Sequence, residues 1–212
     1  IYHEINHHYG GGELKGYKQS RLKGILFAII GASLWGLGGT VSDFLFKHAG
    51  INVDWYVTTR LIISGLFLLV MFKIMNSRQS IFVIFTRVSH VITLIIYSLF
   101  GMLIVQYAYM ASINEGNAAV ATLLQYIAPV YIILWFAFRG KEKLRAFDIV
   151  VVLLTLIGTF LLLTNGSLSK LIVAPSSLFW GILAGLALAF YTIYAEKLLN
   201  KYASILVVGW AM

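Results

Sequence analysis

The first candidate catalytic group lies at the N-terminus, where His3, Glu4 and His7 match the zincin motif H-E-x-x-H. On a helix this spacing places both histidines on one face to bind zinc, and the glutamate can activate a zinc-bound water. A run of three glycines follows, and no later polar cluster offers an obvious third ligand. We therefore expect a disordered cytoplasmic or non-native tail over residues 1–22, with no bound metal or cofactor. A membrane-embedded metallohydrolase is the less favoured alternative.

Polar residues inside apolar segments form the second candidate group, because an ionisable or amide side chain is costly in hydrocarbon. Asp43 and Arg60 lie near facing ends of consecutive segments and are expected to pair at the outer face. The alternative is an interfacial Asp and a snorkelling Arg. Gln106 and Gln125 must either bridge helices or face a polar cavity. Pro129 lacks an amide hydrogen, so we expect its helix to bend and to leave a carbonyl near Gln125 partly unpaired.

The elements that must position these residues are membrane helices. Apolar residues make up 60% of the 212 positions, charged residues only 11%, and the mean hydropathy is +0.87. Backbone amides have no water to bond in the hydrocarbon core, so segments this apolar must be helical. The absence of cysteine excludes disulfides and Cys-based metal or redox sites. The expected spans are 24–46, 55–75, 91–113, 118–138, 147–164, 177–195 and, cut short, 203 onward.

Basic residues follow the alternation of a multi-pass membrane protein, although a net charge of +8 could also suggest nucleic acid. Thirteen of the sixteen Lys and Arg lie before the first expected span or after the second, fourth and sixth. By the positive-inside rule, these connections and the N-terminus are cytoplasmic. We therefore expect a lipid bilayer and no nucleic acid as partner, and a location in the cell membrane of a bacterium.

The sixth expected span begins like the first, with Gly181-Ile182-Leu183 matching Gly24-Ile25-Leu26. If this similarity reports a duplicated unit, the unit holds an odd number of spans, and its second copy enters the bilayer from the opposite side. Inverted repeats of this kind are typical of transporters. The charge alternation independently gives the first and sixth spans opposite directions.

Several short motifs lie along the expected spans: Leu34-Trp35-Gly36, Trp55 through Arg60, the Tyr-rich end of the third span, Asn117 through Ala121, Ala128-Pro129-Val130, Lys141-Glu142-Lys143 and Gly158. In these motifs the sequence resembles the EamA domain of the drug/metabolite transporter superfamily, over about residues 22–212 and with the second unit truncated. One departure is Ile149-Val150, which stands where a small glycine often begins the fifth span.

The resemblance implies an all-α integral membrane protein of ten spans, built as two inverted five-helix units. The first unit would cover residues 23–166, an external linker 167–176, and the start of the second unit 177–212, so the chain is expected to be a fragment. By family analogy, the substrate cavity would be lined by Trp35, Gln106, Tyr109, Gln125 and Tyr191, with Arg60 providing outer-face electrostatics.

The function that the resemblance implies is transport by alternating access, without enzymatic activity. The substrate would be a small polar molecule: an amino acid, a nucleotide or sugar derivative, or a drug-like compound. Two further questions stay open at this point. The protein could instead be a non-transporting membrane scaffold or receptor, and it could form a homodimer.

Overall fold

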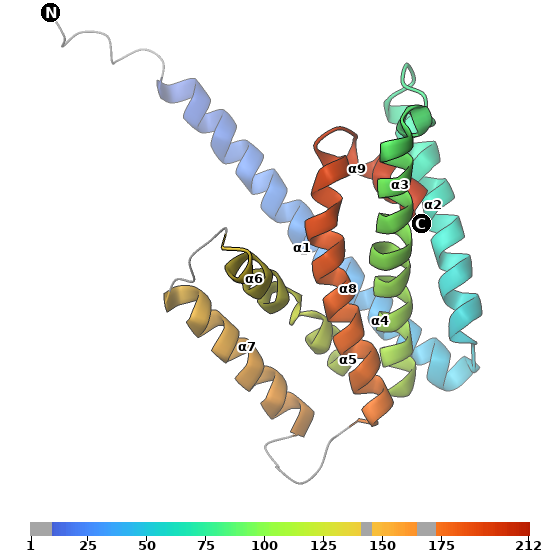
Figure 1. Ribbon diagram of the computed structural model, residues 1–212, viewed down its shortest axis with the longest axis vertical. Coiled ribbons are helices and arrows are strands. Elements are labelled where there is room, and N and C mark those ends of the chain that lie inside the picture. Colours follow the sequence, from blue (N-terminus) through green and yellow to red (C-terminus); the bar gives the residue numbers. More distant parts are fainter. Residues whose placement is uncertain (1–9, 141–145, 165–172) are drawn as a thin grey trace, which may run out of the picture. The chain divides into compact units, whose positions relative to one another are not determined.

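The computed structural model describes residues 10–140, 146–164 and 173–212, which form helices joined by turns (Figure 1). Within these residues, five helical stretches are long and apolar enough to cross a membrane: 24–49, 53–75, 88–115, 118–138 and 175–199. Phe147–Leu161 is a shorter apolar helix. The polytopic helix bundle predicted from the sequence is therefore confirmed. The elements are α1 (Gly10–Ala49), α2 (Val53–Met75), η1 (Val83–Thr86), α3 (Val88–Ile96), η2 (Tyr97–Leu103), α4 (Ile104–Glu115), α5 (Ala118–Gln125), α6 (Ala128–Phe138), α7 (Ala146–Thr164), α8 (Pro175–Leu199) and α9 (Ser204–Ala211).

The chain divides into two compact units, residues 1–40 and residues 41–212. In the first unit, α1 is already helical from Gly10, so residues 10–22 of the tail predicted to be disordered or non-native belong to a helix. Extending an existing helix avoids the cost of nucleation, because each added residue gains one hydrogen bond. Good helix formers such as Leu14, Lys15 and Gln19 favour this extension over the cost of the three glycines.

In the second unit, short polar turns set where the helices begin and end. Gly50 has a φ of +61°, the left-handed conformation that glycine adopts without strain, and it follows the last residue of α1. Asn52 then caps α2, since its side-chain oxygen accepts the amide hydrogens of Asp54 at 2.7 Å and Trp55 at 3.3 Å. Asn117 caps α5 in the same way through the Val120 amide at 2.9 Å.

The most extensive helix pair of the second unit is α4 with α8, and α8 also packs on η2, α5 and α6 (Figure 1). Small residues on α8 let its backbone come close to neighbouring helices. Close contact matters because hydrocarbon supplies no hydrophobic driving force, so van der Waals packing must hold the helices together. A Cβ at Gly181 would meet the Leu124 Cβ at 2.8 Å, and one at Gly185 would meet the Leu124 carbonyl oxygen at 3.0 Å. The α8 backbone therefore lies directly against α5.

Helix α8 runs opposite to α4 and to the last turns of α1. Ser176, at the start of α8, donates a 3.0 Å hydrogen bond to Glu115, at the end of α4. The Val41–Ala49 part of α1 ends at the same end of this unit, where Asp43 contacts Ala118 at the start of α5. These helix directions are those that the predicted inversion requires.

The third spanning stretch, 88–115, is one continuous helical run that contains a π-helical segment, η2. Nothing in the sequence predicted this segment. π-segments are rare inside α-helices and often occur at functional sites, because they turn side chains away from the regular helical positions. Here η2 carries Tyr97 and Gly101 to the surface of α8.

Candidate functional site

The α4–α5 hairpin carries two buried glutamines, and its geometry places them at the same depth. The Tyr109 hydroxyl and the Thr122 hydroxyl hydrogen bond at 2.9 Å across the hairpin. Gln106 lies three residues before Tyr109, and Gln125 lies three residues after Thr122. Residues three apart share a helix face. Because the hairpin is antiparallel, both glutamines lie about one helical turn further than Tyr109 and Thr122 from the segment that joins α4 to α5. The exposed fractions of Gln106 and Gln125 are 4% and 1%.

Each glutamine has one amide atom without a hydrogen-bond partner among the described residues: Oε1 of Gln106 and Nε2 of Gln125. Nε2 of Gln106 contacts the Met102 sulfur at 3.9 Å, which is a weak interaction. The two unpaired atoms are an acceptor and a donor, so they would bond to one another if they were within reach. A buried amide atom without a partner costs roughly 1–3 kcal/mol. Neither of these two atoms therefore bridges two helices in this structure.

Tyr191 on α8 lies further along the same helix interface. Its ring stacks on that of Tyr97 in η2, with ring centroids 5.0 Å apart and an interplanar angle of 28°. A Cβ at Gly101 would meet the Tyr191 Cα at 3.4 Å, so η2 and α8 are in close contact there. Gly185, which lies against the Gln125 backbone, is six residues before Tyr191, or about 9 Å along the helix axis at 1.5 Å per residue. The predicted cavity residues of this unit therefore follow a line rather than surround one point.

Trp35 belongs to the first unit, so only four of the five predicted cavity residues are placed within the second unit. Neither of two surface cavities in the described part of the chain includes a predicted cavity residue. One, of about 650 Å³, lies beside η1 and the α8–α9 turn. The other, of about 330 Å³, lies between the start of α2 and the α4–α8 pair. In the conformation described, the glutamines are enclosed by packed helices.

The fourth spanning stretch is interrupted next to Gln125. Helix α5 ends at Gln125, residues Tyr126 and Ile127 form a turn, and α6 restarts at Ala128 with Pro129 in its first turn. Pro129 cannot donate a hydrogen bond to the Gln125 carbonyl, four residues earlier, because its nitrogen carries no hydrogen. Interruptions of this kind expose backbone groups where a site can use them.

The expected Asp43–Arg60 pair does not form in this structure. Asp43 instead pairs with Lys47, with Oδ1 and Nζ 2.8 Å apart, and its Oδ2 accepts the Ala118 amide hydrogen at 3.5 Å. The Arg60 guanidinium contacts the Met110 sulfur at 3.8 Å. Lys47 is one turn after Asp43 on the same helix, and an i,i+4 partner needs no second helix to bring it into place.

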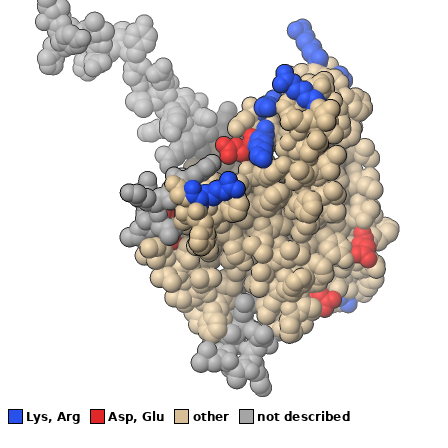
Figure 2. Space-filling model, in the orientation of Figure 1, with Lys and Arg blue, Asp and Glu red and all other residues tan. Residues whose placement is uncertain are grey.

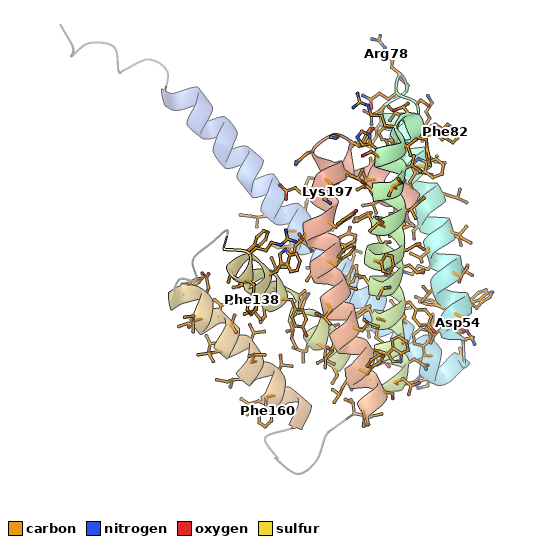
Figure 3. The ribbon with its side chains drawn as sticks, in the orientation of Figure 1. Asp54, Arg78, Phe82, Phe138, Phe160 and Lys197 are labelled. Atoms are coloured by element: carbon orange, nitrogen blue, oxygen red, sulfur yellow. The ribbon has the colours of Figure 1, made fainter. Side chains whose placement is uncertain are left out.

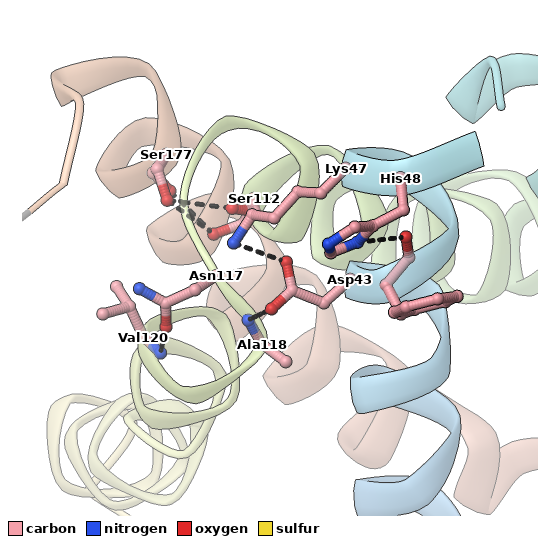
Figure 4. A network of polar contacts seen from close by, with 9 residues as sticks. Asp43, Lys47, His48, Ser112, Asn117, Ala118, Val120 and Ser177 are labelled. Atoms are coloured by element: carbon pink, nitrogen blue, oxygen red, sulfur yellow. Dashed lines mark hydrogen bonds and ion pairs between the residues drawn. The ribbon is translucent and has the colours of Figure 1, made fainter. Parts of the chain in front are cut away.

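A polar contact that the sequence did not indicate joins α4 to α8 near this network. The Ser112 hydroxyl donates to the Ser177 carbonyl at 2.8 Å, and the Ser177 hydroxyl donates to the Ser112 carbonyl at 2.9 Å. Both side chains are fully buried. The contact lies at the end where α4 turns into α5, as Figure 4 shows. Such reciprocal bonds hold that end of the helix pair together.

The zincin motif at His3, Glu4 and His7 lies outside the described residues. Among the residues that the structure describes, no group of three or more His, Cys, Asp or Glu could hold a metal ion. The glycine run after the motif, Gly10 to Gly12, forms the start of α1.

Comparison with known proteins supports the family resemblance. The model of the EamA-like transporter family matches residues 22–164. The chain is 36% identical over 193 residues to YicL of Salmonella typhimurium, described as an uncharacterized inner membrane transporter. That match covers 91% of this chain and 64% of the relative's length. The chain is also 30% identical over 90 residues to YxxF of Bacillus subtilis, described as an uncharacterized transporter, covering 42% of this chain and 29% of that relative. No solved structure matches.

Proposed function

Because this chain belongs to the EamA-like transporter family, we propose that the full-length protein moves a small polar metabolite across a bacterial cell membrane by alternating access. The distribution of Lys and Arg supports a cytoplasmic N-terminus. The chain spans 64% of the length of its Salmonella relative, so the proposal concerns the full-length protein.

The observation that carries this proposal is the unpaired donor and acceptor of Gln125 and Gln106. Apolar side chains of similar size would pack these helices without the cost of unpaired amides. The arrangement therefore favours a polar substrate that accepts a hydrogen bond from Gln125 and donates one to Gln106. Amino acids and sugar derivatives carry both kinds of group. The stacked Tyr97 and Tyr191 rings, deeper along α8, would shape the path that the substrate follows.

Alternating access requires that water and substrate reach Gln125 in other conformations, although the side chain is only 1% exposed in this one. The 212 residues contain no cysteine, so an introduced cysteine is the only thiol that this part of the protein contributes to the test. We expect Gln125→Cys to react with a membrane-impermeant thiol reagent added from either side of the membrane, and an added substrate to slow the reaction.

The matched control is Leu124→Cys. Leu124 is the preceding residue of α5, is 2% exposed, and belongs to an apolar core cluster with Val120 and Ile127. It should stay unreactive under the same conditions. Equal resistance of both positions to the reagent from both sides would contradict the proposal.

A further inference from the structure

The larger surface cavity, of about 650 Å³, lies at the end of the second unit opposite to Asp54 and the start of α2. Figure 3 places Arg78 and Phe82 at this end and Asp54 at the other. The cavity is formed by the loop after α2, by η1, and by the turn between α8 and α9. Lys201 and Tyr202 line it from that turn, and Ser80 lines it from the loop. No predicted cavity residue takes part in it.

The hydrogen bonds of His90 determine which hydrogens of Lys201 and Tyr202 remain available to a ligand in this cavity. Lys201 Nζ lies 3.1 Å from His90 Nε2, and an ammonium group can only donate, so Nε2 must be the acceptor. The proton of the neutral imidazole is then on Nδ1, which lies 2.7 Å from the Tyr202 hydroxyl oxygen and donates to it. The tautomer is assigned from these partners. Consequently the Tyr202 O–H is free to donate elsewhere, as are the two remaining N–H groups of Lys201.

Ser80 supplies a further donor by similar reasoning. Its hydroxyl oxygen accepts the Phe82 amide hydrogen at 3.2 Å, which leaves its own O–H available. By contrast, the Thr86 hydroxyl already donates to the Val83 carbonyl at 2.8 Å. The cavity thus presents an ammonium and two hydroxyl donors from Lys201, Tyr202 and Ser80.

Charge around the cavity is positive and uncompensated in the part of the chain that the structure describes. No Asp or Glu lines the cavity. No carboxylate among the described residues lies within 4 Å of the Lys201 or Lys73 ammonium. Lys73 donates to the carbonyls of Ser77 at 2.8 Å and Gln79 at 3.4 Å, and Gln79 also lines the cavity. Figure 2 shows Lys and Arg gathered over the connection between α2 and α3.

The rim of the cavity is apolar and aromatic. Phe82 lines it and remains 58% exposed. Its ring contacts that of Trp210 with centroids 5.5 Å apart, and the Trp210 indole donates to the Ile81 carbonyl at 2.8 Å, which fixes the position of the indole. Aromatic residues of this kind are typical of the membrane–water interface, where one ligand can meet both polar and apolar surroundings.

We propose that this cavity binds the phosphate group of an anionic ligand, with Lys201 as the charged contact, Tyr202 and Ser80 as hydroxyl donors, and His90 positioning both Lys201 and Tyr202. A phosphate offers several acceptor oxygens for these donors, and basic pockets at the ends of membrane helices bind lipid headgroups. Two sources supply this chemistry: the headgroup of an anionic glycerophospholipid and a soluble phosphate ester. The site is separate from the transport proposal, since it shares no residue with the glutamine region.

The test uses the full-length protein in an uncharged detergent with two probes. Dioleoyl-phosphatidylglycerol binding is counted by native mass spectrometry, with dioleoyl-phosphatidylcholine, which is zwitterionic and has no net charge, as the comparison. Glycerol 3-phosphate binding is measured by titration calorimetry. We expect Lys201→Gln to weaken binding of one or both phosphate probes about tenfold, the scale of one lost charge-assisted hydrogen bond.

The matched control is Lys197→Gln, because Lys197 lies one turn earlier, in the last turn of α8, and is not among the residues that line the cavity. Its ammonium lies over the Tyr194 ring, 4.3 Å from the centroid. Binding by this variant should stay close to that of the unaltered protein. Tyr202→Phe removes one hydroxyl, keeps the charge, and should weaken binding severalfold. It provides the test if Lys201→Gln does not fold.

The two probes distinguish the source of the phosphate. Lys201-dependent binding of phosphatidylglycerol alone identifies a lipid site, and Lys201-dependent binding of glycerol 3-phosphate identifies a site for soluble phosphate esters. If neither probe binds, or if Lys201→Gln and Tyr202→Phe both bind as well as Lys197→Gln, the proposal is overturned.

Discussion

Gly181→Leu is expected to destabilise the second unit by about 3 kcal/mol or more, because an added side chain has no space between α8 and α5. A Cβ at this position already meets the Leu124 Cβ at 2.8 Å and the Ser112 hydroxyl at 3.0 Å. The bulkier side chain would force the helices apart and strain the reciprocal Ser112–Ser177 bonds. The measurement is the apparent melting temperature of the detergent-solubilised protein, followed by Trp fluorescence.

Gly158→Leu is the control for this prediction. Gly158 is also a glycine within an apolar helix, α7, but apart from its chain neighbours and the adjacent backbone of α7, no atom of the described residues lies within 4 Å of an added Cβ there. The substitution should leave the melting temperature nearly unchanged, or raise it slightly, since leucine favours a helix by up to about 1 kcal/mol over glycine. Equal melting temperatures for the two variants would show that α8 does not pack on α5 as described.

Gln125→Leu is expected to separate stability from function. The substitution removes a fully buried amide whose Nε2 has no partner among the described residues, so the protein should gain about 1 kcal/mol of stability. Transport should nevertheless fall about tenfold or more, because the substrate loses a hydrogen-bond donor inside the membrane. Gln106→Leu, which removes the acceptor, should behave in the same way. Melting temperature and flux are measured on the same preparations.

Ser98→Ala is the matched control. Ser98 lies in η2 of the third spanning stretch, and its hydroxyl donates to the Leu94 carbonyl at 2.8 Å within the same helix. Its loss should change flux by less than about twofold, as expected for a polar group already paired within its own helix. A Gln125→Leu protein that is destabilised but transports normally would assign the glutamine a purely structural role.

The helical architecture was predictable because the positions of membrane spans depend on the local order of apolar and charged residues in the sequence. Apolar length and the need to pair every backbone amide determined where the spans lie, and the structure places them within a few residues of the prediction. The interruption before Pro129 also follows a local rule, since proline removes one amide hydrogen and affects only its own helix.

The site was less predictable because its contacts depend on how helices meet. Asp43 and Arg60 occupy the expected segments, but the local partner Lys47 and the Ala118 amide take the carboxylate. Gly181 was interpreted as the start of a repeat, whereas in the structure it also lets α8 approach α5. The π-segment η2 was not predicted, and it packs on α8, where the Tyr97 ring stacks on that of Tyr191.

The measurement that tests the central claim most directly is flux into liposomes containing the full-length protein. The assay measures exchange of an external compound against the same compound trapped inside the liposomes. The compounds screened are amino acids, nucleotide and sugar derivatives, and drug-like compounds. We expect saturable, protein-dependent exchange of at least one small polar compound, reduced about tenfold or more by Gln125→Leu and retained by Ser98→Ala. Exchange equal to that of empty liposomes for every compound class, with protein that is shown to be folded, would contradict it.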